Sequence, residues 1–216
     1  MGPGPSLASP TPIELLVRDS GPKQNKNSRP INMSFTSVKF PSFPSHPVFL
    51  AYYDNVTAST LATVKKELIA RNDTYNYCFL STTHIVSLEQ LRCALHKAVQ
   101  NLVQNTMKAN SVNTEIIFSL SPVNNINDAL KRFGVDESRS DTIVIKVCDA
   151  DTDVAALEKT VSELLEAQPV ALTDEKLLGR YDAKKFRKLF KLSDAVDTSP
   201  QALTNGAVAA SLLRGL

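Results

Sequence analysis

The side chains that most often carry out catalysis are few in this chain, and they stand apart from one another. His46 lies in a proline-flanked stretch, His84 ends an apolar run, and His96 lies within a helical pattern. Cys78 and Cys148 fall within apolar runs, where buried thiols are usually inert. Nucleophilic catalysis needs a base within hydrogen-bond reach of the nucleophile, and no spacing in the chain indicates such a pair.

An acidic cluster and the glycines decide the questions of metal and nucleotide binding. Asp149, Asp151 and Asp153 resemble the start of a calcium-binding loop. Such a loop requires glycine at its sixth position and glutamate at its twelfth, where this chain has Val154 and Thr160. No two glycines after the N-terminal segment are close enough to form a phosphate-binding loop. The sequence therefore predicts no metal, no cofactor and no enzymatic activity.

The segment from Lys184 to Lys191 is rich in cations. At 100° per residue one face of a helix carries four cations, and Phe186, Leu189 and Phe190 take the other. The four cations, called the ridge below, are Lys184, Arg187, Lys188 and Lys191. Two interpretations stay open: a solvated face over a buried aromatic stripe, or a ridge that contacts RNA phosphates. The net charge of only +2 gives no global basic field, so any nucleic-acid site must be a local patch.

The segment from Glu115 to Gly134 is the most distinctive part of the chain. We expect an apolar strand at 116–120, a stop at Ser121-Pro122 and an Asn-rich turn. A short helix at 126–133 should follow, with Gly134 ending it in a left-handed conformation. None of these residues forms a nucleophile, a metal-ligand set or a phosphate loop, so the segment indicates a shaped surface.

The helix at the end of this segment admits two interpretations. Asn125 precedes it, and a cap or turn is the favoured role for an asparagine at that position. Ile126, Leu130 and Phe133 fall on one face of the helix. They form part of the core, or they dock a partner if the sheet already covers that face.

Apolar periodicity places these residues on an alternating series of elements. We expect strands at 48–53, 77–80, 116–120 and 141–147. We expect helices at 59–71, 88–107, 126–133, 153–166, 174–181, 183–192 and 200–213. Strands interleaved with helices predict an α/β or α+β fold, with a single mixed β-sheet packed with helices and a helical C-terminal part.

Length and composition bound the organisation. Six of the 12 prolines precede Met33, and residues 1–32 lack periodicity, so we expect a disordered N-terminal extension followed by one domain over 33–216. The three widely spaced cysteines favour reduced, intracellular thiols. No apolar run approaches the roughly 18 residues of a membrane span, so we expect no membrane contact and a nuclear or cytosolic location.

Several short motifs, in order and spacing, resemble a known family. They are Met107-Lys108, Thr114-Glu-Ile-Ile-Phe118, Leu120-Ser-Pro122, Asn124-Asn-Ile126, Ala129-Leu-Lys131 and Phe133-Gly134. This set is similar to the Cgi/PRPK-binding-protein family, the small regulatory subunit of the KEOPS (EKC) complex. The later Phe190-Lys-Leu-Ser193 and Leu213-Arg-Gly-Leu216 resemble fungal members. The resemblance covers the chain from about Val48 onward.

The resemblance implies a non-catalytic subunit without a cofactor. Its direct partner would be the amino-terminal lobe of the KEOPS kinase/ATPase, through which it meets the other KEOPS subunits. It would capture the single-stranded CCA end of tRNA and support threonylcarbamoylation of the adenosine beside the anticodon. The family also implies a role in transcription and telomere maintenance, and a location on nuclear chromosomes and in the cytoplasm.

The residue patterns and the resemblance together give two groups of candidate site residues. The kinase-binding candidates are Asn125, Ile126, Ala129, Leu130 and Phe133. The RNA-binding candidates are Lys108, Lys184, Arg187, Lys188, Lys191 and Arg214.

One departure from the family pattern concerns RNA. Many relatives read Gly-Lys-Met-Lys-Thr-Arg where this chain reads Asn105-Thr-Met-Lys-Ala-Asn110, so of three cations only Lys108 carries over. Each phosphate contact adds about one unit to the salt dependence of binding, so we expect tRNA binding here to be weaker or to depend on other residues. A kinase-binding module without RNA contact is the alternative, and a small independent enzyme is a third reading that no constellation supports.

Overall fold

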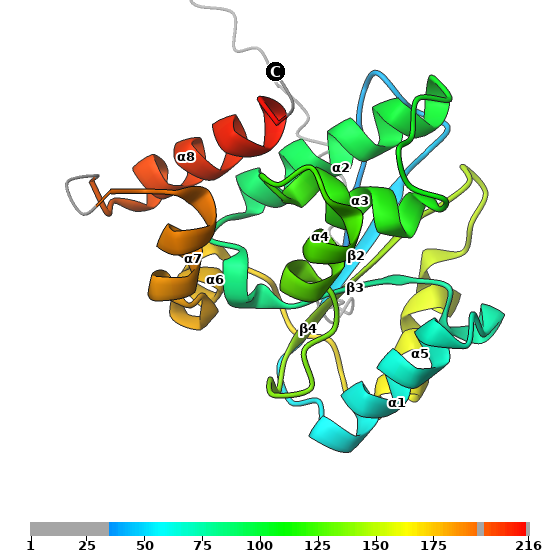
Figure 1. The fold of residues 1–216 in the computed structure, drawn as a ribbon. Helices are drawn as coiled ribbons and strands as arrows, with labels where there is room; N and C mark the ends of the chain where they lie inside the picture. The colour runs from blue at the N-terminus through cyan, green and yellow to red at the C-terminus, as the bar shows by residue number, and fades with distance from the viewer. Residues whose placement is uncertain (1–34, 194–196, 215–216) are drawn as a thin grey trace, which may run out of the picture. The chain divides into compact units, whose positions relative to one another are not determined.

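The structure is a computed structural model that describes residues 35–193 and 197–214 (Figure 1). At its centre lies strand β2 (Val48–Tyr53), in which all six residues are buried. Alternate side chains of β2 join two different hydrophobic clusters, one on each face of the sheet. Because both faces are covered, the strand has no polar alternation and appears in the sequence as one apolar run.

Four strands form a single sheet in the order β1-β2-β4-β3. The other strands are β1 (Phe35–Val38), β3 (Cys78–Leu80) and β4 (Thr142–Val147). The α/β class, the single sheet and the helical C-terminal part are confirmed. The expected mixture of strand directions is wrong, because every ladder among the described residues is antiparallel. Long helical connections permit either direction, so alternation of strands and helices alone does not determine it.

Helices cover both faces of the sheet (Figure 1). Helices α1 (Ala58–Ile69) and α5 (Val154–Leu165) pack on one face. The cluster on the other face includes residues of α2 (Leu88–Val103), α3 (Val112–Leu120) and α4 (Ile126–Phe133). The remaining elements are α6 (Asp174–Arg180), α7 (Ala183–Phe190), α8 (Pro200–Leu212) and the 3-10 turns η1 (Asp73–Tyr75) and η2 (Thr82–His84).

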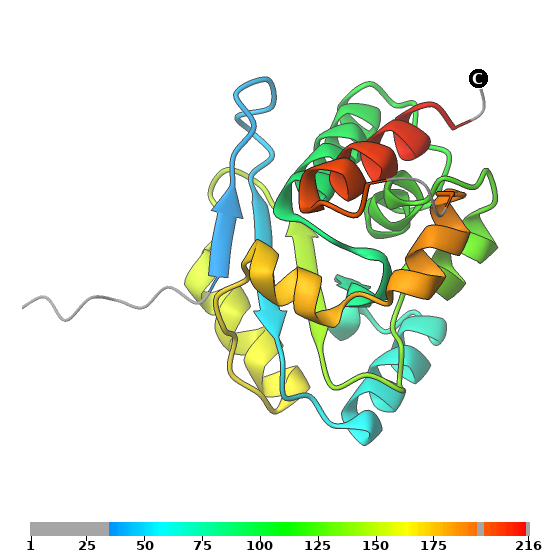
Figure 2. The same ribbon diagram turned by 90° about the vertical axis from the view of Figure 1, so that its left-hand side faces the viewer.

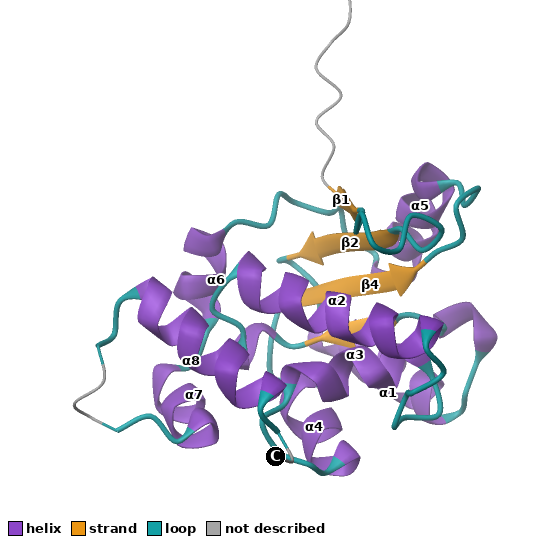
Figure 3. Cartoon of the chain, turned by 90° about the horizontal axis from the view of Figure 1, so that it is seen from above, coloured by secondary structure: helices purple, strands orange, loops and turns teal. Residues whose placement is uncertain are grey.

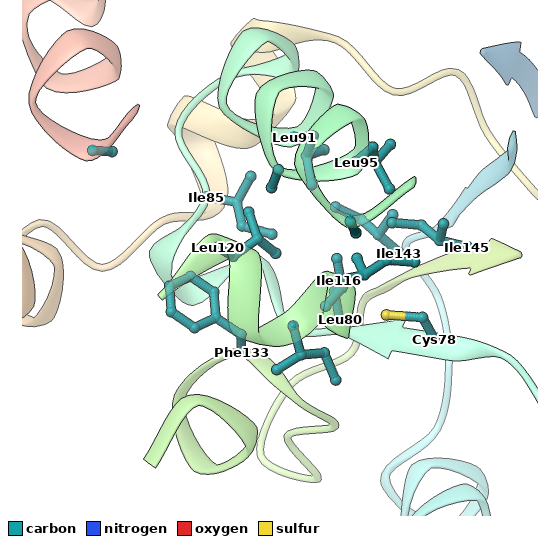
Figure 4. Close-up of a cluster of buried hydrophobic side chains, with 14 of the residues drawn as sticks. Cys78, Leu80, Ile85, Leu91, Leu95, Ile116, Leu120, Phe133, Ile143 and Ile145 are labelled. Atoms are coloured by element: carbon teal, nitrogen blue, oxygen red, sulfur yellow. The ribbon is translucent and has the colours of Figure 1, made fainter. Parts of the chain in front are cut away.

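The larger core is formed by helices pressed onto the sheet (Figure 4). Leu91 of α2 and Ile116 of α3 meet Ile143 and Ile145 of β4 in one cluster, and Phe133 of α4 closes it. All five side chains are at most 1% exposed. Figure 2 shows the connection between β1 and β2 extending beyond the end of the sheet.

The segment predicted as a strand at 116–120 is part of helix α3, so this prediction is wrong. Six consecutive residues from Glu115 to Leu120 are buried. A helix buried on every side shows no polar stripe, and its short run of Ile and Phe cannot be told from a buried strand by periodicity. The signal for a helix was Ser111, whose Oγ accepts a hydrogen bond from the Thr114 N–H at 3.2 Å as an N-cap.

Helix α4 ends at Gly134 for a different reason from the one expected. Gly134 has φ −70° and ψ −171°, so the predicted left-handed conformation is wrong. A Cβ at this position would lie 2.4 Å from the carbonyl oxygen of Leu130. The chain therefore uses glycine here because the backbone passes too close to the last turn of the helix for any side chain.

Candidate functional site

A buried carboxylate organises the loop that carries Lys108. The loop, residues 104–111, joins α2 to α3, and the Lys108 side chain is exposed. Glu115 is fully buried in the first turn of α3. Its Oε2 accepts hydrogen bonds from the backbone N–H of Lys108 at 3.0 Å and of Ala109 at 2.9 Å. Its Oε1 accepts a third from Asn101 Nδ2 at 2.7 Å.

Helix α7 has the two-sided arrangement that its sequence predicts. Phe186, Leu189 and Phe190 are buried on its inner face. Its cations point outward: Lys184 and Lys188 are exposed. Asp182 is the N-cap of α7: its Oδ1 accepts a hydrogen bond from the Lys185 N–H at 2.9 Å and so defines where the helix begins.

The two remaining cations of the ridge differ from each other. Arg187 is half-buried, and its Nη2 donates to the carbonyl of Ser193 just beyond the helix. Lys191 is exposed and stands in the left-handed conformation, with φ 53°, at the C-cap. The ridge therefore offers three exposed ammonium groups on the helix and its cap, together with a guanidinium already engaged at the end of the helix.

Arg214, proposed from the sequence as an RNA contact, packs against helix α3. Its Nη1 donates to the carbonyls of Phe118 and Ser121, the latter at 2.9 Å. Its guanidinium carbon lies 3.6 Å from the centroid of the Phe118 ring. Burial lowers the pKa of Arg214, and the charge of Glu115 opposes this effect. The side chain thus places a cation at the C-terminus of α3, where the helix dipole favours one.

The kinase-binding candidates on α4 separate into core and surface. Ala129 and Phe133 are fully buried in the core. Ile126 is half-buried, whereas Leu130 is 38% exposed. Asn125 is exposed, and its Oδ1 caps the helix by accepting the Asp128 N–H at 3.0 Å. Of the five candidates, Asn125 and Leu130 are therefore exposed on the surface, and Ile126 is partly so.

The structure does not bring all candidate cations together. Figures 1 and 3 show α6, α7 and α8 grouped at one end of the helical layer and the connection between α2 and α3 at the other. Lys108 and the α7 ridge are therefore separate positive features. Sequence reasoning missed Glu115 as a site residue. The signal was a single carboxylate beside the apolar residues 116–118, because a carboxylate in such a place is buried only when it has a polar partner.

Among the described residues, no group of three or more His, Cys, Asp and Glu side chains could hold a metal ion. No helix in the described part of the chain is long and apolar enough to cross a membrane.

Comparison with known proteins assigns the family. Residues 53–215 match the family model described as "Kinase binding protein CGI-121". The chain belongs to this family. The matched range includes the α2–α3 loop, α4 and α7, so every candidate residue lies within the CGI-121 region. The resemblance read from the short motifs is thereby confirmed.

Fungal members of the CGI-121 family are similar over most of their length. A relative from Candida albicans, named "EKC/KEOPS complex subunit CGI121", is 34% identical over 202 residues, which is 85% of this chain and all of the relative. The protein of the same name from Debaryomyces hansenii is 38% identical over 85% of this chain and all of its own length. The Schizosaccharomyces pombe relative is 30% identical over 81% of this chain and 97% of its own.

Proposed function

We propose that this protein is the KEOPS subunit that binds and activates the small kinase/ATPase of the complex and helps to recruit tRNA for threonylcarbamoyl-adenosine modification. One observation carries the proposal: the CGI-121 kinase-binding model matches nearly the whole described chain. The similarity to KEOPS subunits along their full length supports the same assignment. As a non-catalytic partner, the protein would contribute surfaces to the complex, and the reacting groups would come from other subunits.

The outward side of α4 is our candidate for the kinase contact. Leu130 presents an apolar side chain in an otherwise polar turn, with Lys131 and Arg132 exposed beside it. A partner bound here would cover Leu130 and leave the flanking charges at the edge of the contact, as in interfaces with an apolar centre and a polar rim. Ala129 and Phe133 would support the contact from the core by fixing how α4 lies against α3 and η2. Size-exclusion chromatography of the protein mixed with the kinase subunit tests this part, and co-elution as a one-to-one complex is the expected result.

The exposed cations are our candidate for the tRNA contact. The loop that carries Lys108 lies at one end of the helical layer and helix α7 at the other. A single-stranded CCA end needs cations for its phosphates and apolar surface for its bases. We propose that Lys108 contacts the single-stranded end and that the α7 ridge meets phosphates elsewhere on the tRNA body.

Charge reversal at Lys108 tests the RNA contact. Lys108→Glu should weaken tRNA binding and lower the slope of log affinity against log salt by at least about 0.7, the value for one single-strand phosphate contact. Lys66→Glu, an exposed cation on α1 on the opposite face of the sheet, is the matched control and should leave the affinity unchanged. Salt-titrated binding to tRNA with and without its CCA end is the measurement.

The outcome of this titration distinguishes two hypotheses: a subunit that recruits tRNA, and a kinase-binding module without RNA contact. If Lys108→Glu lowers the tRNA affinity but kinase co-elution persists, the recruiting role is supported. If tRNA binding is absent from the parent protein and the kinase complex still forms, the protein is a kinase-binding module without RNA contact. Equal loss of both activities in Lys108→Glu would point to a damaged fold or a shared surface.

We further propose that the protein is located in the nucleus, on chromosomes and telomeres, and in the cytoplasm, as an assembled KEOPS subunit would be. Its link to telomeres and transcription would then depend on the kinase contact. Imaging of a fluorescent fusion, compared with the same fusion carrying Leu130→Asp, tests this: nuclear signal that needs Leu130 supports the proposal, and exclusion from the nucleus contradicts it.

A further inference from the structure

Glu115 lies in a setting that a carboxylate occupies only when its charge is compensated. The side chain is fully buried. It has three hydrogen-bond donors and stands in the first turn of α3, where the helix dipole favours a negative charge. Two of the donors are successive backbone N–H groups, and both bond to the same carboxylate oxygen.

The hydrogen bonds of Glu115 stabilise the α2–α3 loop rather than helix α3 itself. Helix α3 has its own N-cap at Ser111, so it does not need Glu115 in order to start. The N–H groups of Lys108 and Ala109, by contrast, are both bonded to Glu115 Oε2. A carboxylate that accepts both bonds fixes the backbone at Lys108 and thus the direction in which its exposed side chain leaves the surface.

We propose that Glu115 is a positioning residue for RNA: its buried carboxylate holds the loop at residues 104–111 in one conformation, so that Lys108 is presented ready to contact a phosphate. This inference rests on the RNA contact proposed above. A loop that is already held in its binding conformation loses less conformational entropy when RNA binds, so the affinity is higher. The loop has only one cation, Lys108, and the bonds to Glu115 let the loop present it without a change of backbone conformation.

Amide hydrogen exchange tests the positioning step without any RNA. In the parent protein the amides of Lys108 and Ala109 should exchange more slowly than that of Asn110 beside them, although all three lie in a loop. Glu115→Gln keeps the side-chain volume but replaces a charged acceptor by a neutral one. It should raise exchange at these two amides by roughly tenfold, the factor that follows from weakening a charge-assisted hydrogen bond.

A double-mutant cycle tests whether Glu115 acts through Lys108. Glu115→Gln should lower the affinity for tRNA and the salt slope about as much as Lys108→Ala does. In the double variant the affinity should equal that of Lys108→Ala alone, because the contact has already been lost. Glu89→Gln is the matched control: it makes the same chemical change at an exposed residue of α2, outside the loop, and it should leave the tRNA affinity unchanged.

The results separate failure of the inference from failure of the proposed function. Losses of affinity that add in the double variant, or fast exchange of the two amides in the parent protein, would overturn the positioning role while the Lys108 contact stands. If Lys108→Ala does not change the tRNA affinity, the RNA role of the loop is overturned. Increased exchange in Glu115→Gln would then show that the carboxylate fixes a loop with another purpose.

Discussion

At the scale of single residues, α4 shows how neighbours on one short helix take different tasks. Phe133 and Leu130 are three residues apart on the same helix, yet one is fully buried and the other is 38% exposed. The spacing of apolar residues placed both on one face but could not decide between core and interface. That decision depends on how far the sheet and α3 extend over the helix, which is a property of the assembled fold.

Substitutions at these two residues should therefore affect different properties: stability at Phe133 and kinase binding at Leu130. Phe133→Ala should lower the free energy of unfolding by about 3–5 kcal/mol, because it leaves a cavity in the core. Leu130→Asp should change stability by less than about 0.5 kcal/mol but abolish co-elution with the kinase subunit. Denaturant titration and size-exclusion chromatography measure the two effects. A folded Leu130→Asp variant that still co-elutes would place the kinase contact on another surface.

At the scale of elements, the sequence predicted the amphipathic helices well and the buried helix badly. Helices α1, α2, α5 and α7 each have a buried stripe and an exposed face, and the expected ranges overlap the observed ones. Helix α3 has no such contrast, because its neighbours surround it, and β1 was too short and weakly patterned to be predicted. Periodicity reports solvent on one side of an element, so it fails where solvent is absent.

The contact of Arg214 with α3 gives a prediction at this scale. Arg214→Ala should lower the free energy of unfolding by about 1–3 kcal/mol, because it removes hydrogen bonds to two carbonyls and the contact with the Phe118 ring. Lys188→Ala, an exposed cation of the α7 ridge, is the control and should have little effect on stability. Thermal unfolding of both variants is the measurement.

The same two variants also separate a structural cation from an RNA contact. Because the Arg214 guanidinium is engaged with α3, we expect Arg214→Ala to leave the salt slope of tRNA binding unchanged, whereas Lys188→Ala should lower it. If a folded Arg214→Ala variant showed a lower salt slope of tRNA binding, Arg214 would contact RNA after all.

At the scale of the whole molecule, buried polar groups tie distant segments together. Asp141, the residue before β4, accepts hydrogen bonds from Tyr52 of β2, Thr82 of η2 and Arg139. His84 Nδ1 lies 3.0 Å from the Arg132 carbonyl, and because a carbonyl can only accept, Nδ1 carries the proton. Its ring packs on Phe133, so η2 and α4 are held together by a titratable group.

This arrangement makes the stability of the molecule depend on pH. Burial lowers the pKa of His84 below its ordinary value of 6.5, so the folded state favours the neutral ring. The contribution to stability is complete above pH 6.5. As the pH falls below 6.5, His84 binds a proton in the unfolded chain before it does so in the folded protein, and the free energy of unfolding decreases. One group lowers it by at most about 1.4 kcal/mol per pH unit. The decrease stops once the pH is below the pKa of His84 in the folded protein.

Denaturant titrations between pH 8 and pH 5 measure this effect. In His84→Gln the decrease in stability below pH 6.5 should be smaller than in the parent protein. Between pH 7 and pH 8 the two proteins should differ by a constant amount, which reports only the altered packing. Parallel curves over the whole range would assign the pH dependence to other groups.

The order in which the chain is synthesised gives the packing of α8 a further meaning. Helix α8 packs against α2 and α3, and Arg214 bonds to carbonyls 96 and 93 residues earlier in the sequence. A ribosome adding about 5–20 residues per second needs roughly 4–16 s to pass from the end of α3 to the start of α8. During this interval the apolar surface of α2 and α3 that α8 covers in the folded protein stays uncovered, so chaperones that bind apolar segments can reach it.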